Sequence, residues 1–431
     1  MTKDTQITIY LDCTRLLRTS QSLRPTGICR VDIHFLYSII TDQEFYPLGF
    51  VESVLADEVT NVFFEISHET TRTLIATCYE KWINGGPNDE LYIEAIQTIL
   101  KDVGDEAKAA AVKFGKAQQI DSRILQRTNQ DKVAPKYLNT TFVNIPLGLQ
   151  HGELMSFLNF DKYYHVYDLI PFKYPEFMWD DNAPKKHLNR LCAVAKCGAK
   201  IIVMSEYVKN DINIVLTQLQ IQTPDMVVIN PGAEEVFTGS SIHERGVFNP
   251  IPKFTIVSTI DRRKNHLLLL NIWRELIEVY GEDAPELHII GKRGTGSTAV
   301  SNMIERSPAL QSKVKEHEGL RDEEIVAHLL GSRAALFPSF DEGWGLPIVE
   351  SLSMGIPVIC SDIPVHRECS QGYATFISPI DGIGWKNAIL KIISESRSDW
   401  VTRVENTKGF IPIRWSDSTG KMNSYIKTGD V

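Results

Sequence analysis

The amino-acid sequence predicts an α/β fold: two doubly wound domains that face each other across a cleft. Short apolar runs alternate with helical patterns along most of the chain, the order that produces parallel sheets with helices on both faces. One stretch, from Thr238 to Pro252, contains turn residues without periodicity, and we expect the interdomain linker there. We therefore divide the chain into an N-terminal domain, residues 1–240, and a C-terminal domain, residues 253–412.

The N-terminal domain is expected to begin with a strand at Ile7–Leu11, a polar loop and a helix that starts at Gly27. Residues 101–127 place apolar side chains at helical spacing, which predicts an amphipathic helix. Its apolar side is rich in alanine, which favours packing in the core over contact with an anionic membrane or a lipid-linked acceptor. Further strands are expected at Phe45–Phe50, Val62–Ile66, Phe142–Ile145, Tyr163–Tyr167, Ile201–Met204 and Met226–Ile229.

The C-terminal domain shows a second alternating series that begins at Lys253. The expected strands are Phe254–Ser258, Leu287–Ile290, Ala334–Phe337, Ile356–Cys360 and Ala374–Ile377. The expected helices are His266–Tyr280, Asp322–Leu330, Pro347–Met354 and Gly384–Ser394.

Composition narrows the class of protein. A chain of 431 residues is long enough for two large domains or three ordinary ones, and its net charge of −9 argues against a general nucleic-acid binder. No run of about 18 apolar residues occurs, so no membrane span is expected. The N-terminus lacks a signal-peptide core, and the seven cysteines form no CxxC pair. These features predict a cytoplasmic protein.

The most informative stretch is Phe337 to Asp362, which is a strand, a glycine-containing loop, a helix and a second strand. Pro347 at the start of the helix and Gly355 just after its end are typical helix boundaries. Gly343 and Gly345 in the loop allow the backbone to approach a ligand closely. The N–H groups and the dipole at the start of such a helix favour a phosphate.

Two glutamates complete this loop and helix. Glu350, in the first turns of the helix, can accept hydrogen bonds from a ribose diol, and Glu342 in the loop can face the group attached to the phosphate. Diphosphate, ribose and a third group together describe a nucleotide-sugar. The alternative is an ordinary helix with a solvated glutamate.

The string EGWGLPIVE, followed by ESLSMGIPV, resembles the donor site of retaining glycosyltransferases of family 4, which have the GT-B fold of two Rossmann-like domains. The resemblance implies a catalytic role for Glu342. It also implies that the last helix, about residues 413–431, packs back on the N-terminal domain. The donor site would include Gly343, Trp344, Gly345, Leu346 and Glu350.

A basic turn in STIDRRKNHLLLLNIW places Arg263 and Lys264 near a helix start. Arginine binds phosphate oxygens in a fork and lysine binds them as a point charge. The turn resembles the family's RKN turn, which implies that the pair neutralises the donor diphosphate as it leaves; the alternative is a solvated turn. The same resemblance places Gly291, Lys292 and Leu320 beside the nucleotide.

The N-terminal domain carries weaker signals. RPTGICRV resembles the family's glycine loop, so Gly27 would allow the donor or acceptor to approach the helix start. Arg30 either points into the cleft or is an exposed helix residue. KYYHVYDLIP departs from the family, because Tyr167 replaces the histidine that commonly precedes the aspartate. Either Tyr167 or His165 could take the role of that histidine, and His165 could instead be a core residue. Asp168 either serves catalysis or caps the next turn.

No metal ligands are evident, because Asp180 and Asp181 are adjacent and the histidines show no ligand spacing. We therefore expect neither a metal nor another cofactor. The resemblance implies a retaining transfer of a hexose or deoxyhexose from a nucleoside-diphosphate sugar, of the GDP-mannose or dTDP-rhamnose type. The acceptor would be a glycan or lipid-linked glycan of a bacterial surface polysaccharide, and peripheral membrane association would fit. The alternatives are a non-catalytic GT-B glycan-binding or scaffold protein and a nucleotide-sugar epimerase.

Overall fold

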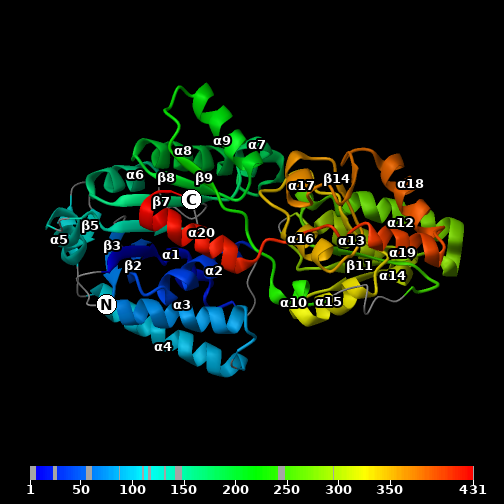
Figure 1. The fold of residues 1–431 in the computed structure, drawn as a ribbon, viewed down its shortest axis with the longest axis horizontal. Coiled ribbons are helices and arrows are strands. Elements are labelled where there is room, and N and C mark those ends of the chain that lie inside the picture. The colour runs from blue at the N-terminus through cyan, green and yellow to red at the C-terminus, as the bar shows by residue number, and fades with distance from the viewer. Residues whose placement is uncertain are drawn as a thin grey trace.

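The computed structural model describes residues 6–22, 27–54, 61–86, 88–108, 111–114, 118–130, 133–140, 148–240, 248–294 and 296–430. Two sheets occupy separate halves of the molecule (Figure 1), and the strands of one precede those of the other in the sequence. The change from the first sheet to the second falls between Val228 and Lys253.

The N-terminal sheet has nine strands in the order β4-β5-β3-β2-β1-β6-β7-β8-β9. It is parallel from β2 through β1 to β9, but β2–β3 and β4–β5 pair antiparallel, so this sheet is mixed at one edge. Its strands are β1 (Ile7–Asp12), β2 (Phe45–Val54), β3 (Asn61–Ile66), β4 (Ala111–Phe114), β5 (Gln118–Asp121), β6 (Lys136–Asn139), β7 (Asp161–Val166), β8 (Lys200–Val203) and β9 (Met226–Val228).

Helices cover both faces of this sheet, and the described core residues form one apolar cluster on each side. The helices and short 3₁₀ segment are α1 (Thr14–Thr19), α2 (Gly27–Thr41), α3 (His68–Trp82), α4 (Asp89–Lys108), α5 (Ser122–Gln130), α6 (Gly148–Phe157), α7 (Ile170–Lys173), η3 (Pro175–Phe177), α8 (Ala183–Lys196), α9 (Glu206–Gln218) and α10 (Glu235–Thr238).

The predicted helix over residues 101–127 is wrong. Helix α4 ends at Lys108, strands β4 and β5 follow as an antiparallel pair, and α5 begins at Ser122. Ile120 is fully buried and pairs with Phe63 on β3, so sheet pairing and burial outweigh the helical spacing. The predicted strand Phe142–Ile145 lies outside the described residues.

The C-terminal sheet has six parallel strands in the order β12-β11-β10-β13-β14-β15. All five predicted strands are present, and β12 is an additional edge strand. The strands are β10 (Lys253–Val257), β11 (Glu286–Ile290), β12 (Val314–His317), β13 (Ala334–Phe337), β14 (Val358–Ser361) and β15 (Thr375–Ile377).

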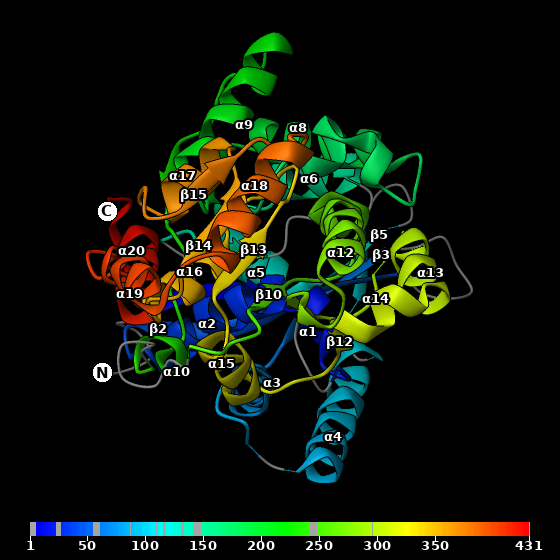
Figure 2. The same ribbon diagram turned by 90° about the vertical axis from the view of Figure 1, so that its right-hand side faces the viewer.

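Figure 2 looks onto the C-terminal domain, with α12, α13 and α14 on one side of the strands and α16 and α17 on the other. The fully buried Trp273 and Trp385 anchor the cluster on the α12 side. Its helices and 3₁₀ turns are η4 (Arg262–Lys264), α12 (His266–Tyr280), η5 (Gly281–Asp283), α13 (Thr298–Arg306), α14 (Pro308–Lys313), α15 (Asp322–Leu330), α16 (Leu346–Ser353), α17 (Pro364–Cys369), α18 (Gly382–Ile393) and α19 (Arg397–Glu405).

The last helix, α20 (Trp415–Thr428), leaves the C-terminal domain and packs beside α2 (Figure 1). Met422 and Ile426 are buried there, and Ser38 Oγ on α2 lies 3.1 Å from Asn423 Oδ1. The Tyr425 hydroxyl donates to Asp225 at 2.9 Å. The end of the chain is thereby part of the N-terminal half.

Candidate functional site

Helix α16 begins where the loop after β13 meets the cleft between the domains. Gly345 is the N-cap residue and has no side chain to bond the first N–H groups, and Pro347 lies in the first turn. Gly345 Cα is in close contact with its surroundings, because a Cβ there would lie 2.9 Å from Cys369 Sγ. The start of α16 therefore has no side-chain cap, and the positive end of its dipole favours an anion there.

Glu342 lies in front of this helix and contacts two cations. Its carboxylate oxygens form ion pairs with Arg263 Nη1 and Lys264 Nζ. Arg263 Nη1 also donates to the Asp341 carbonyl oxygen at 2.7 Å. Burial opposes ionisation of Glu342, but the charges of Arg263 and Lys264 outweigh it and lower the pKa of Glu342 to about 2. The sequence-predicted acid and both predicted cations thus form one cluster.

The basic turn is held in place by its own side chains. Asp261 accepts a hydrogen bond from the Lys264 backbone N–H at 3.2 Å. Asn265 has a left-handed backbone, with φ of 58°, and its Nδ2 donates to the carbonyl oxygens of Pro338 at 3.2 Å and Pro379 at 2.9 Å. Arg262, whose role the sequence left open, donates to the Glu176 carbonyl of the N-terminal domain at 3.1 Å.

Glu350 is buried on α16 and faces a cation from the opposite domain. Arg30 Nη1, on α2, lies 3.1 Å from Glu350 Oε1. The same guanidinium lies 3.2 Å from Glu234 and 3.5 Å from Asp322. Burial, together with the two neighbouring anions, outweighs Arg30 and raises the pKa of Glu350 to about 7. Of the two alternatives for Arg30, the structure has the one in which it points between the domains.

A cavity of about 220 Å³ lies between the two domains, next to the basic turn. Tyr167 and Asp168 line it from one domain and Arg263 from the other. Asp168 Oδ1 accepts from the Ile170 N–H at 3.0 Å, so it also caps the following turn. The remaining lining residues are Ile28, Ile170, Pro171, Met178, His187 and Asp261.

His165 occupies the core instead of this cavity. It is fully buried, with Phe35 and Tyr167 rings 5.4 Å and 4.4 Å from its ring, and burial lowers its pKa to about 3. A neutral ring packed between aromatic side chains fits the core alternative. Tyr167 donates its hydroxyl to Asp32 on α2.

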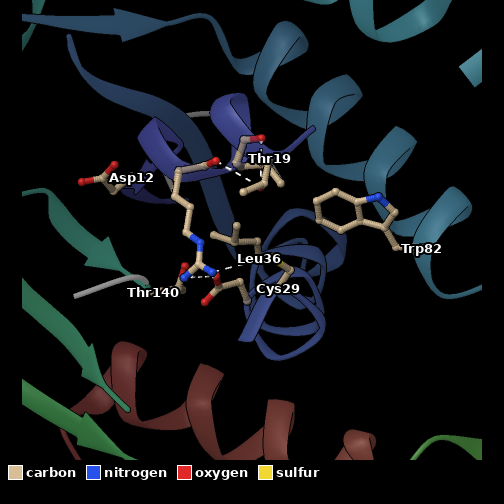
Figure 3. Close-up of a pocket in the computed structure, with 9 residues that line it drawn as sticks. Asp12, Thr19, Cys29, Leu36, Trp82 and Thr140 are labelled. Carbon is tan, nitrogen blue, oxygen red and sulfur yellow. Dashed lines mark hydrogen bonds and ion pairs between the residues drawn. The ribbon is translucent and has the colours of Figure 1, made fainter. Parts of the chain in front are cut away.

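A second, much smaller cavity of about 10 Å³ is lined by Asp32, the partner of the Tyr167 hydroxyl (Figure 3). Asp12 and Thr140 lie on one side of it and Trp82 on the other. Arg15 forms an ion pair with Asp32 at 3.8 Å, and burial outweighs this pair and raises the pKa of Asp32 to about 7. Sequence reasoning missed both residues, since neither belongs to a motif.

The glycines and Trp344 have packing roles that the sequence did not indicate. A Cβ on Gly343 would lie 2.2 Å from the Tyr167 carbonyl oxygen, so this glycine allows the two domains to touch. Trp344 is buried in an apolar cluster. Gly291 has φ of +152°, and a Cβ there would lie 2.0 Å from the Ser258 carbonyl oxygen. A Cβ on Gly27, by contrast, would meet nothing within 4 Å.

Three predicted donor contacts lie on the surrounding loops and helix start. Lys292 follows β11, and its carbonyl oxygen accepts from the Ile260 N–H at 2.9 Å. Leu320 is partly exposed in the loop before α15, and Leu346 is partly buried at the start of α16. Contacts with a ligand stay a prediction for all three.

Sequence reasoning also missed a set of polar contacts between the domains beside Glu342. Lys173 on α7 forms ion pairs with Asp341 at 3.1 Å and with Asp211 at 2.7 Å, and the Tyr207 hydroxyl donates to Asp341 at 2.8 Å. Glu368 accepts from the Tyr207 N–H at 3.2 Å. Only Asp341 had a signal in the sequence, its place next to Glu342. These contacts hold the domains in the present arrangement.

Comparisons with known proteins agree with this geometry. Residues 251–395 match the family model described as Glycosyl transferases group 1. The serotype-specific mannosyltransferase WbdA of Escherichia coli is 34% identical over 131 residues, which cover 30% of this chain and 15% of that protein. The O-antigen chain mannosyltransferase RfbU of Salmonella typhimurium is 40% identical over 73 residues, covering 17% of this chain and 20% of that protein. The matched part spans no more than a fifth of either relative.

Solved structures resemble the whole chain. Sucrose-phosphate synthase from Thermosynechococcus elongatus has a TM-score of 0.60 at 13% identity and covers 98% of both chains. Anabaena Alr3699/HepE, solved in complex with UDP, has a TM-score of 0.57 at 12% identity and covers 98% of this chain and 100% of that one. The chain therefore has the predicted GT-B fold, and part of it is similar to bacterial mannosyltransferases. Among the described residues, no helix is both long and apolar enough to cross a membrane.

Proposed function

We propose that this protein is a retaining glycosyltransferase that transfers a hexose from a nucleoside-diphosphate sugar to a glycan acceptor of a bacterial surface polysaccharide. The observation that carries the proposal is the cluster of Glu342, Arg263 and Lys264 at the start of α16, beside the cavity between the domains. The family match over residues 251–395 supports it independently.

The donor diphosphate would take Arg263 and Lys264 as partners. Both cations now neutralise Glu342, so a diphosphate that binds them frees this carboxylate to accept hydrogen bonds from sugar hydroxyls. Burial lowers the pKa of Lys264 despite Glu342, so the ammonium gains from an additional anion. Two cations and the uncapped start of α16 supply the charge neutralisation that a metal supplies in other enzymes, and we propose metal-independent transfer.

The nucleoside would bind on the other side of α16. Glu350 would accept hydrogen bonds from the ribose diol and exchange its present partner, Arg30, for the sugar ring. Gly291, Lys292 and Leu320 lie on the loops that follow β11 and β12, where the base would rest. Arg30 retains Glu234 as a partner when Glu350 turns to the ribose.

The transfer step would proceed without a protein nucleophile. The acceptor hydroxyl enters from the N-terminal side of the cavity, near Tyr167 and Asp168. It attacks the anomeric carbon from the face that the diphosphate leaves, and the departing phosphate oxygen takes its proton. The protein then contributes positioning and a preorganised positive charge for the leaving group.

The mannosyltransferase relatives favour mannose as the sugar, with GDP-mannose as donor, ahead of dTDP-rhamnose. The acceptor would be a glycan or lipid-linked glycan. We also propose that the protein associates peripherally with the membrane that carries a lipid-linked acceptor. A non-catalytic GT-B scaffold and a nucleotide-sugar epimerase are the alternatives. Neither would release nucleoside diphosphate in proportion to an added acceptor.

The first experiment is a thermal-stability screen of the purified chain with GDP, UDP and dTDP, because a bound nucleotide raises the melting temperature. The second measures acceptor-dependent release of that nucleoside diphosphate, with and without chelator, and determines the anomeric configuration of the product by NMR. We expect retained configuration and activity in the chelator. The proposal is contradicted if none of the nucleotides raises the melting temperature. It is also contradicted if the release of nucleoside diphosphate does not depend on the acceptor.

A further inference from the structure

Three histidines from separate elements of the C-terminal domain come together outside the Glu342 cluster. His288 lies on β11, His317 ends β12 and His328 lies on α15. One ring nitrogen of each lies within 4.8 Å of the other two. The ring centroids of His288 and His317 are 5.0 Å apart with nearly parallel planes, and those of His317 and His328 are 4.4 Å apart. Three elements therefore place one imidazole nitrogen each within reach of the other two.

The hydrogen bonds around His288 match those of a metal-ligating histidine. His288 Nε2 lies 3.1 Å from Glu286 Oε2, so the ring donates its Nε2 proton to this carboxylate. Its Nδ1 then has no proton, carries a lone pair that can bind a metal, and accepts a hydrogen bond from His317 Nε2 at 2.9 Å. Histidines that bind metals usually donate their other N–H to a carboxylate or carbonyl, which fixes the tautomer and strengthens the ligand.

The contact between Lys253 and His328 decides which ring nitrogen of His328 can bind a metal. Lys253 Nζ donates to His328 Nδ1 at 3.3 Å, which leaves the proton of a neutral ring on Nε2, so Nδ1 is the atom that a metal would bind in place of Lys253.

We propose that His288, His317 and His328 bind a divalent transition-metal ion, with zinc as the first choice. Zinc bonds imidazole nitrogen at about 2.0–2.1 Å, so two such nitrogens on one tetrahedral ion lie roughly 3.3 Å apart. The histidine nitrogens are within 4.8 Å of each other, and side-chain motions of about 1.5 Å or less close the site. His317 changes tautomer, so that its Nε2 faces the ion, and a water molecule completes the coordination.

The ligand set also selects the class of ion. Imidazole suits zinc, copper, nickel and cobalt, whereas magnesium and calcium prefer carboxylates and carbonyls. The ion would connect β11, β12 and α15, next to the backbone bond from the Gly291 N–H to the His317 carbonyl oxygen at 2.9 Å. Its role would be structural, and the proposal does not depend on glycosyl transfer.

The test uses the full chain without a polyhistidine tag, stripped with chelator and titrated with zinc chloride in a calorimeter. We expect one zinc per chain and a higher melting temperature. The cobalt complex should show the intense visible absorption of a tetrahedral site.

Variants separate this site from binding elsewhere. His317→Ala or His328→Ala should weaken zinc binding at least tenfold, and Glu286→Gln should weaken it about 10- to 100-fold by removing the orienting carboxylate. Lys253→Met should strengthen it, because a neighbouring cation is lost. His68→Gln, which removes an imidazole from the N-terminal domain, is the matched control and should change nothing.

Two results would overturn the proposal: no zinc binding above that of a histidine-free control protein, or binding that His317→Ala and His328→Ala leave unchanged. Circular dichroism checks that each variant folds. If an alanine variant does not, His328→Gln keeps a polar side chain of similar size, and the opposite effects of Glu286→Gln and Lys253→Met decide the question without removing any ligand.

Discussion

Glu342 and Glu350 are both buried carboxylates on the C-terminal wall of the cleft, but their electrostatic surroundings are opposite. Glu342 contacts two cations from its own domain, and its pKa is about 2. Glu350 contacts one cation from the other domain, Arg30, which it shares with Glu234 and Asp322, and its pKa is about 7. The two cations beside Glu342 keep its carboxylate ionised. At Glu350, three carboxylates share one cation, so uptake of one proton by Glu350 reduces the excess of negative charge.

The difference separates two tasks. The Glu342 cluster is a preformed anion site, because Glu342 and both cations belong to the same domain. The Glu350 cluster joins the domains, so the same carboxylate that would bind ribose also stabilises the contact between α2 and α16. We infer that donor binding replaces the contact between Glu350 and Arg30 with contacts to the ribose. In the Glu342 cluster, donor binding would only rearrange the existing contacts.

The largest expected effect belongs to Glu342→Gln. This change leaves the partly buried Arg263 and Lys264 without their counter-charge, and the cost to stability should approach the roughly 3–5 kcal/mol of breaking a fully buried pair. Denaturant unfolding measures it, with Glu278→Gln on the exposed face of α12 as the control. A loss equal to that of the control would show that solvent, and not Glu342, balances the two cations.

Lys264→Ala should cost a charge-assisted contact of about 1.5–3 kcal/mol, or about 10- to 100-fold in donor affinity or transfer. Calorimetry with the nucleoside diphosphate and initial-rate kinetics measure the two quantities. Lys391→Ala, an exposed lysine on α18, is the matched control. Wild-type donor affinity and rate in Lys264→Ala would contradict the phosphate assignment.

The pH dependence of stability should differ between Glu350→Gln and the wild type. The pKa of Glu350 rises from 4.5 to about 7 in the folded state, so the folded state holds more protons across that range. Its contribution to stability is complete below pH 4.5 and is lost as the pH rises to about 7. The difference in unfolding free energy between Glu350→Gln and the wild type should therefore change by on the order of 1–3 kcal/mol between pH 4.5 and 7.

Asp32, whose pKa is also about 7, is present in both proteins and cancels from this comparison. Parallel stability profiles for wild type and Glu350→Gln would mean that Glu350 stays ionised beside Arg30. The ribose assignment is tested separately, because Glu350→Gln should weaken nucleotide binding without unfolding the protein.

The smallest expected effect is that of Asp322→Asn. Its carboxylate lies 3.5 Å from Arg30 and raises the pKa of Glu350 by repulsion, but its side chain is more than a third exposed, so solvent screens most of the interaction. The pH midpoint of the Glu350 contribution should fall by a fraction of a unit. A rise in that midpoint would show that Asp322 acts mainly through Arg30.

The parts of the site that are contiguous in sequence were predictable. The loop from Asp341 to Gly345 and the basic turn after β10 both follow strands of one parallel sheet, so the ends of these strands had to bring Glu342 and Lys264 together. The second alternating series of strands and helices likewise predicted every strand of the C-terminal sheet except the edge strand β12.

The remaining parts depend on contacts between distant segments. Nothing near Arg30 in the sequence indicates Glu234, Asp322 and Glu350, because these partners come from the residue before α10, from α15 and from α16. The three histidines of β11, β12 and α15 were judged to lack ligand spacing for the same reason. Between residues 101 and 127, pairing of β5 with β3 decided the structure, and periodicity within the segment could not reveal that partner.

The chain passes from one domain to the other twice. The second passage, before α20, is bonded to the segment that follows β9: the Ala233 N–H donates to the Ile413 carbonyl oxygen at 2.9 Å, and Ser418 donates to the Asn230 carbonyl. Two covalent connections tied side by side resist twisting and sliding but still permit bending about their common line. The two domains are thus expected to open by a hinge motion about these two connections. Helices α2 and α16 would then make the same contacts each time the domains close.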